Sequence, residues 1–290
     1  MSSRASSPPE PEVGRVPSIR DNERLWNKKY DWSRGGSEWS SLWGGVESQW
    51  HWVIFPRIHS FVPALNILEI GAGFGRWSEY LKELSTSLVL VDVSERCIAA
   101  CRARFADDAH VSCHVNDGRS LAMAEDESID FAFSFDSLVH VEQDVIEAYV
   151  SQLERKLAPE GAAFLHHSNL AGLERGVEHT HWRAPSVSAE SVRKFAEDAG
   201  FVCVAQELIN FGDSHVGRGQ ELIDCFTVLC RRGSPSARPT RMAENPDFMP
   251  QSELITKLAP LYGGFGDHEE EDVRVGPGRL RRFLPRMRRS

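Results

Sequence analysis

The residues best placed for chemistry surround a glycine-rich turn near position 70 of this 290-residue chain. The apolar run 67–70 contains Glu69 and leads into three glycines at alternate positions, Gly71, Gly73 and Gly75. A second apolar run, 88–91, ends in Asp92. Glycines permit backbone conformations and close approaches that a Cβ would block, and an acid about 20 residues further on can accept hydrogen bonds from ribose hydroxyls. The pattern predicts a sheet that binds a nucleotide-like cofactor.

The glycine spacing narrows the choice of cofactor. The glycines read G-x-G-x-G rather than the G-x-G-x-x-G of dinucleotide enzymes, and the chain contains no G-x-x-x-x-G-K-[ST] phosphate loop. Nucleotide hydrolysis of the phosphate-loop type is therefore disfavoured. A nicotinamide-dependent dehydrogenase is a rival interpretation, because it shares the strand, the glycine turn and the acid.

Four segments, in order and at matching spacing, resemble the motifs of class I S-adenosylmethionine-dependent methyltransferases. They are 69–75, Val91-Asp92-Val93-Ser94, Asn116-Asp117-Gly118 and 133–141, and they fall within roughly residues 65–170. The resemblance implies S-adenosyl-L-methionine as cofactor and S-adenosyl-L-homocysteine as product. The motifs beyond Asp92 argue against the dehydrogenase.

The resemblance also implies a role for individual residues. Gly71 and Gly73 would let the backbone turn under the methionine part, while Glu69 would orient that turn or meet the amino group. Asp92 would hold the ribose. The other implied cofactor-binding positions are Val93, Asn116, Asp117 at the adenine amino group, Gly118 leaving room for the ring, Phe135, and Asp136 beside the methionine portion. Taken singly, such aspartates are more often helix N-caps or turn residues.

Methylation of a hydroxyl needs a base to remove the proton, and histidine suits this because its ordinary pKa is about 6.5. His140 lies four residues beyond Asp136, just past the fourth expected strand. His166 and His167 end the fifth expected strand, where only one of two adjacent side chains faces the cleft. We predict that His140, His166 or His167 is the catalytic base. A buried, hydrogen-bonded histidine without a catalytic part is the alternative for each.

The acceptor is expected between an aromatic N-terminal segment and the loop after the fifth strand. Aromatic faces attract cations such as a sulfonium, and polar loop residues can read hydroxyls. The predicted substrate-binding residues are Trp39, Trp43, Asn169, His181 and Arg183. The segments that carry them resemble small-molecule methyltransferases of glycan and natural-product pathways.

These patterns favour O-methylation of a small polyhydroxylated metabolite, a sugar or natural product. N-methylation of an amino-sugar or other amine is the nearest rival. A non-catalytic scaffold that keeps the fold is another, because fold does not imply function.

The sequence predicts no metal site. Asp136 fits one carboxylate position of metal-using O-methyltransferases, but Ser168-Asn169 stands where those enzymes have an Asp-Asn pair. Hard cations require several oxygen ligands. The six cysteines show no paired C-x-x-C spacing.

The elements that must position these residues alternate between strand and helix from residue 66 onward. Apolar runs predict strands near 66–71, 87–93, 110–116, 129–136, 161–168, 202–209 and 224–231, and helices near 75–85, 94–105, 142–157 and 188–199. This order predicts an α/β fold with a Rossmann-like, doubly wound, seven-stranded sheet, mostly parallel with an antiparallel last strand. An aromatic-rich helical cap would precede it.

Composition shifts divide the chain into four parts. We expect a disordered tail at 1–20, the aromatic cap at 21–60, the cofactor-binding domain at 61–232, and a linker with a mobile acidic and basic tail at 233–290.

The bulk properties restrict the partners. A net charge of −9 argues against a nucleic-acid-binding body, although the Arg-rich end is typical of a basic tail. The chain has no apolar run long enough to cross a membrane and no signal peptide. We predict a cytoplasmic protein with a small-molecule acceptor, and we leave a homo-oligomer open.

Overall fold

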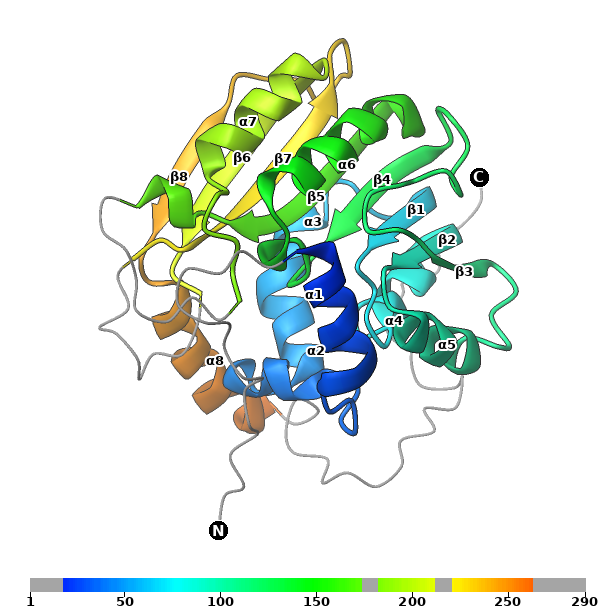
Figure 1. Ribbon diagram of the computed structural model, residues 1–290. Coiled ribbons are helices and arrows are strands. Elements are labelled where there is room, and N and C mark those ends of the chain that lie inside the picture. Colours follow the sequence, from blue (N-terminus) through cyan, green and yellow to red (C-terminus); the bar gives the residue numbers. More distant parts are fainter. Residues whose placement is uncertain (1–17, 174–181, 212–220, 263–290) are drawn as a thin grey trace, which may run out of the picture.

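The computed structural model describes residues 18–173, 182–211 and 221–262. The described part contains an eight-stranded sheet in the order β3-β2-β1-β4-β5-β7-β6-β8 (Figure 1). β7 runs antiparallel to β5 and β6, and the other pairings are parallel. The strands are β1 Ala64–Ile70, β2 Ser85–Asp92, β3 Val111–Val115, β4 Ile129–Ser134, β5 Leu157–Ser168, β6 Phe201–Ile209, β7 Asp224–Arg231 and β8 Arg241–Asn245.

The α/β Rossmann-like prediction is confirmed, and the predicted number of strands is wrong by one. The extra strand, β8, pairs in parallel with β6 and is followed by helix α8, Phe248–Tyr262. Both lie in the segment that the sequence assigned to a linker and tail. β8 reads Arg-Met-Ala-Glu-Asn and is largely exposed, so it lacks the apolar alternation that would mark a strand.

Helices pack on the two faces of the sheet. In Figure 1, α6 and α7 lie side by side over one face. Besides α8, the α-helices are α1 Ile19–Arg24, α2 Val46–Gln49, α3 Phe55–Ile58, α4 Ser78–Leu81, α5 Glu95–Arg104, α6 Gln143–Lys156 and α7 Ala189–Asp198. Two π-helical turns, Leu25–Lys29 and Trp50–Ile54, extend α1 and α2, and a 3-10 turn spans Ser37–Trp43.

Alternation along each strand divides the core between the two faces. In β4, Phe131 and Phe133 pack in one cluster with the N-terminal Trp50, while Ala132 belongs to the opposite cluster with Val150 of α6. Successive strand side chains point to opposite faces, so buried strands need apolar residues at nearly every position. This explains why β4 was readable from its sequence.

The strand order reverses between β1 and β4, because the chain leaves β1 toward β2 on one side and β4 toward β5 on the other. In open α/β sheets, ligands bind at the carboxyl ends of the strands at such a reversal. The glycine turn after Ile70 and the loop after Ser134 therefore meet where a ligand site is expected.

Candidate functional site

The glycine turn approaches its neighbours too closely for side chains. Gly71 and Gly75 have φ of 76° and 81°, in the left-handed region. A Cβ on Gly71 would lie 1.8 Å from the Ser137 hydroxyl oxygen, and one on Gly75 would lie 2.7 Å from the Phe105 ring. The turn thus brings the end of β1 against the loop after β4.

Asp92 ties the end of β2 to this turn. Its Oδ2 accepts a hydrogen bond from the Gly73 backbone N–H at 2.9 Å, and its Oδ1 accepts one from the Ser94 N–H at 2.8 Å. Burial raises the pKa of Asp92, and the donated backbone hydrogen bonds oppose that rise. Each carboxylate oxygen has a second lone pair for a ligand hydroxyl.

Glu69 lies behind the turn. The Ser78 hydroxyl donates to its carboxyl group, and burial raises the pKa of Glu69 to about 8. Glu69 is not among the cavity-lining residues, and its hydrogen bond connects the end of β1 to the start of helix α4.

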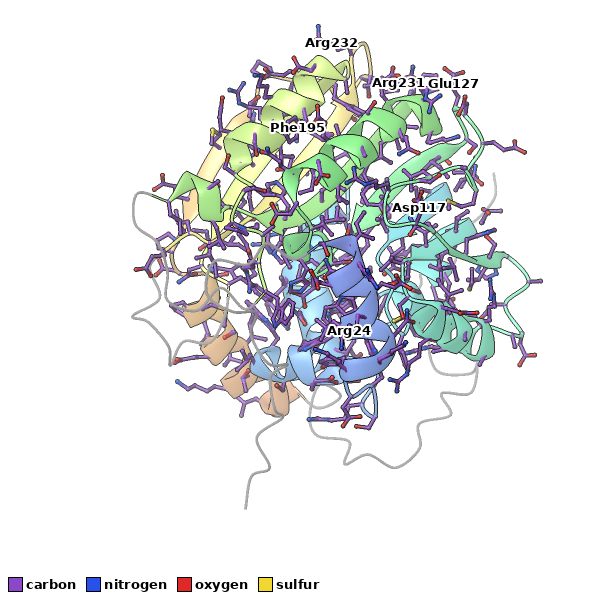
Figure 2. All side chains as sticks on the ribbon, viewed as in Figure 1. Arg24, Asp117, Glu127, Phe195, Arg231 and Arg232 are labelled. Atoms are coloured by element: carbon purple, nitrogen blue, oxygen red, sulfur yellow. The ribbon has the colours of Figure 1, made fainter. Side chains whose placement is uncertain are left out.

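Asn116 and Asp117 support the loop after β3 through their side chains. The Asn116 Oδ1 accepts the Gly118 N–H, and its Nδ2 donates to the Tyr149 hydroxyl at 2.9 Å. Asp117 lies on this loop (Figure 2), exposed, and its Oδ1 accepts the backbone N–H groups of Arg119 and Ser120. These two bonds lower the pKa of Asp117. Gly118 lines the cavity, whereas Asp117 does not.

Asp136 occupies a left-handed backbone conformation, with φ of 63°, directly after β4. The buried guanidinium of Arg76 binds its carboxylate at 3.0 Å. Its backbone N–H donates to the His166 Nδ1 at 3.1 Å. These two contacts hold a conformation that is uncommon for a residue with a side chain. Phe135 beside it is buried against the His166 ring rather than in the cavity wall.

A cavity with an empty volume of about 720 Å³, part of it open to solvent, lies over these strand ends. Its wall combines the glycine turn, carboxylates, apolar side chains and aromatic rings. The lining residues are Ile19, Asn22, Trp26, Trp32, Trp39, Ile70, Gly71, Gly73, Asp92, Val93, Cys97, Gly118, Asp136, Ser137, Leu138, His140, Val141 and Tyr149.

Four aromatic rings from the N-terminal segment gather over the glycine turn. Trp26, Tyr30, Trp32 and Trp39 lie with their centroids 4.9–5.9 Å apart. Trp26, Trp32 and Trp39 line the cavity, and Trp32 stacks on Phe74 at 4.4 Å. Trp43, by contrast, is buried in the core against Phe248 and takes no part in the lining.

His140 lines the cavity in a defined tautomer. Its Nδ1 lies 3.0 Å from the Trp182 carbonyl oxygen, which can only accept, so Nδ1 carries the hydrogen. The lone pair is therefore on Nε2, for which the described residues supply no hydrogen bond. Burial lowers the pKa of His140 to about 4, so the ring is neutral near pH 7.

Both nitrogens of His166 and His167 have protein partners. The His166 Nδ1 accepts the Asp136 N–H, so its Nε2–H donates to Asp224 at 3.2 Å. The His167 Nδ1–H donates to the Ser168 carbonyl, and its Nε2 accepts from the Thr227 hydroxyl. Both rings are fully buried and absent from the cavity wall. Among the three predicted bases, His140 alone has a ring nitrogen without a hydrogen-bond partner in the described part of the chain.

The other predicted acceptor residues have internal partners. Arg183 makes a two-bond ion pair with buried Asp224, at 2.7 and 2.8 Å. The Asn169 side chain bonds the Leu222 carbonyl and the Ala189 N–H. His181 lies outside the described residues. The structure therefore does not bring Arg183 or Asn169 into the cavity wall, and their substrate-binding roles stay predictions.

Asp224 links the two sides of the β4 loop. On one side, Asp224 bonds His166, which accepts the backbone N–H of Asp136. On the other side, Asp224 pairs with Arg183, and the preceding residue, Trp182, supplies the carbonyl that accepts the His140 Nδ1–H. Arg183 holds the pKa of Asp224 down at about 2 despite burial, so the carboxylate is charged.

The sequence interpretation missed several cavity residues. Ile19, Asn22 and Trp26 come from α1 and its π-helical extension at i, i+3 and i+7, a spacing that marks one helix face. That spacing was a usable signal. Ser137, Cys97 and Tyr149 carried none, because they join the wall through tertiary packing.

Within the described ranges, no three His, Cys, Asp or Glu side chains form a group suited to a metal ion. No helix among the described residues is long and apolar enough to cross a membrane.

Comparison with known proteins agrees with this geometry. Residues 67–161 match the family model described as a methyltransferase domain. No curated protein matches the chain. Among solved structures, Haemonchus contortus phosphoethanolamine N-methyltransferase 2, in complex with S-adenosyl-L-methionine, is 16% identical with a TM-score of 0.55 over 74% of this chain and 60% of that one.

Two further structures resemble this chain at lower TM-scores. The PH0226 protein of Pyrococcus horikoshii OT3 is 18% identical, with a TM-score of 0.49 over 72% of this chain and 96% of that one. The N-methyltransferase NodS of Bradyrhizobium japonicum WM9 is 20% identical, with a TM-score of 0.48 over 63% and 95%. At these identities, likeness to a solved structure shows the fold alone. The family match over residues 67–161 and the strand-end cavity together support a methyltransferase domain with S-adenosyl-L-methionine as its cofactor.

Proposed function

We propose that this protein transfers a methyl group from S-adenosyl-L-methionine to a hydroxyl of a small polyhydroxylated metabolite, a sugar or natural product, with His140 as general base. One observation carries the proposal. His140 lines the cavity with its hydrogen on Nδ1, fixed by the Trp182 carbonyl, and its lone pair on Nε2. A neutral imidazole held in one tautomer is suited to receive a proton from a hydroxyl.

The cavity residues fit the cofactor. Asp92 offers carboxylate lone pairs to ribose hydroxyls, Val93 and Leu138 offer apolar surface to a base ring, and Trp26 and Trp39 offer aromatic faces to a cation. When bound, the cofactor supplies a methyl group that its positive sulfur activates for transfer. The chain therefore needs mainly to align the acceptor oxygen and remove its proton.

Charges near His140 influence the proton transfer. Burial disfavours a charged imidazole, as does the nearby Arg183 guanidinium, while the Asp136 and Asp224 carboxylates favour it. The base is thus free of its proton at neutral pH, and the imidazolium formed during transfer faces two negative charges.

N-methylation of an amine is the second candidate, and the aromatic wall favours it. Trp26, Trp32 and Trp39 together attract cations, which include an amine acceptor in its ammonium form. A neutral amine already has a lone pair and needs no base, so this alternative predicts little effect from losing the His140 imidazole.

The test combines binding and turnover. S-adenosylhomocysteine binding is measured by calorimetry on the wild type and His140→Gln, and methyl transfer from labelled S-adenosylmethionine is screened over sugars, other polyols and amines. We expect His140→Gln to bind S-adenosylhomocysteine within about threefold of the wild type, and to lose about 100-fold or more of its turnover of a hydroxyl acceptor.

His59→Gln is the matched control, because His59 is exposed and absent from the cavity wall. It should leave both measurements unchanged. Turnover of amines alone, insensitive to His140, would replace the proposal with N-methylation. Absence of S-adenosylhomocysteine binding to the wild type would favour a non-catalytic scaffold.

A further inference from the structure

We propose that Asn22, on the N-terminal helix α1, recognises the exocyclic amino group of the cofactor's adenine through its side-chain oxygen. This inference rests on the proposed function for the identity of the ligand. It assigns the adenine contact to the helix that covers the cavity rather than to Asp117 on the loop after β3.

The orientation of the Asn22 amide is fixed by its neighbours. Its Nδ2 donates to the His140 carbonyl oxygen at 2.8 Å and to the Ser18 carbonyl at 3.4 Å. Carbonyl oxygens only accept, so the amide nitrogen must face them and Oδ1 must point elsewhere. Asn22 is 5% exposed and lines the cavity.

The Asn22 Oδ1 is buried and has no hydrogen-bond partner in the described part of the chain. A buried acceptor without a partner is costly, and such groups in native proteins are nearly always satisfied. Since this oxygen belongs to a residue of the cavity wall, a bound molecule that presents an N–H or O–H donor would satisfy it.

The place of Asn22 along the cavity selects the donor. Asp92 at the end of β2 is the group suited to the ribose, and the polar glycine turn and Asp136 at the ends of β1 and β4 suit the charged amino-acid part. The base must then extend to the other side of the ribose, toward β3, which is the next strand beyond β2.

Ile19 marks that end of the cavity. Its Cγ2 lies 2.8 Å from the position a Cβ would take on Gly118, directly after β3. Asn22 follows Ile19 by three residues and so lies one helical turn along the same face. The exocyclic amino group is the hydrogen-bond donor that an adenine ring offers. Asp117 is exposed, outside the cavity wall, and uses its Oδ1 on two backbone N–H groups.

The test compares two ligands by calorimetry: S-adenosylhomocysteine and its analogue in which hydrogen replaces the exocyclic amino group. We expect the wild type to prefer the amino-bearing ligand by about tenfold, the scale of one well-made hydrogen bond. In Asn22→Ala this preference should disappear, so that the two ligands bind with about equal affinity.

Arg24→Ala is the matched control, because Arg24 is exposed on the same helix (Figure 2). It should retain the tenfold preference. An equal loss of affinity for both ligands in Asn22→Ala would mean a structural role only and would overturn the inference. So would a preference that disappears in Asp117→Ala but not in Asn22→Ala. If the wild type bound neither ligand, the proposed function itself would fail.

Discussion

At the scale of single residues, burial lowers the pKa of two histidines near the site, His140 and His167. His167 is fully buried, and burial lowers its pKa to about 4, with the carbonyl of Ser168 opposing the shift. In the neutral ring, the His167 Nε2 accepts a hydrogen bond from the Thr227 hydroxyl. Protonation would reverse the direction of this bond and place a charge in the core, where loss of solvation disfavours it.

This pKa shift predicts a pH-dependent stability. The folded-state pKa of His167, about 4, lies below the ordinary value of about 6.5, so the unfolded chain binds more protons between these pH values. The contribution of neutral His167 to the free energy of unfolding is fully present above about pH 6.5 and is lost as the pH falls from there toward about 4. We expect about 2 kcal/mol less unfolding free energy at pH 5 than at pH 7 from this residue.

Urea unfolding of the wild type and His167→Gln at both pH values measures this contribution. The difference between the two proteins should shrink by about 2 kcal/mol at the lower pH. His59→Gln, at an exposed position, should follow the wild type at both pH values. Parallel pH dependence of the wild type and His167→Gln would contradict the assigned pKa.

Residue types alone could not separate the four histidines that the sequence nominated. The motif spacing singled out Asp92 and Gly73, and in the structure the Gly73 N–H donates a hydrogen bond to the Asp92 carboxylate. The roles of His166 and Arg183 depend on Asp224, which is 58 residues from one and 41 from the other. A partner so distant in sequence leaves no local pattern, so buried supports and solvent-facing reactants look alike before folding.

At the scale of elements, Arg76 fastens the N-terminal segment to the sheet. Its guanidinium bonds the Gly36 carbonyl at 3.2 Å, the Ser40 hydroxyl at 3.1 Å and the Asp136 carboxylate at 3.0 Å. It also lies 4.3 Å from the centre of the Trp77 ring. A planar guanidinium can make all these contacts at once, whereas an ammonium cannot reproduce its fixed fork.

We therefore predict that Arg76→Lys loosens the 3-10 turn Ser37–Trp43 more than it loosens the sheet. Amide hydrogen exchange should become about tenfold faster or more in that turn. The reason is that the turn loses two hydrogen bonds from Arg76, one to the carbonyl of its N-cap Gly36 and one to the Ser40 hydroxyl. Exchange in β4 should stay within about twofold of the wild type.

Arg104→Lys provides the comparison, since Arg104 is exposed and pairs with Glu79 at the surface. It should leave the exchange of the turn unchanged. Equal acceleration of the turn and β4 in Arg76→Lys would mean a loss of global stability and would contradict the fastening role.

The elements themselves were largely readable from the sequence. Each predicted strand from 66 to 231 overlaps an observed one, because continuous apolar runs mark strands covered on both faces and alternating runs mark strands covered on one. The N-terminal segment was harder to read. Its aromatic richness showed burial, but the π-helical turns Leu25–Lys29 and Trp50–Ile54 depend on tertiary contacts. Short irregular helices of this kind give no stable period to detect.

At the scale of the whole molecule, α8 joins parts of the chain that are distant in sequence. Phe248, at the start of α8, is fully buried. The centre of its ring lies 4.9 Å from that of Trp43 in the N-terminal segment and 5.6 Å from that of Phe226 in β7. The guanidinium of Arg57 lies 5.4 Å from the centre of the same ring and makes two hydrogen bonds to Glu207 of β6. The C-terminal extension thus completes the hydrophobic core that contains Trp43, Phe226 and Phe248.

This arrangement predicts a large stability cost for Phe248→Ala and a small one for Leu254→Ala on the same helix. The first change removes a ring from three packed elements and leaves a cavity, for which we expect a loss of about 3–5 kcal/mol of unfolding free energy. Leu254 is 58% exposed, so its truncation should cost less than about 1 kcal/mol. Both values follow from urea denaturation monitored by tryptophan fluorescence. Since Trp43 reports on the same contact, Phe248→Ala should also change the native-state emission. Small and equal costs for the two variants would mean that α8 does not contribute to the core.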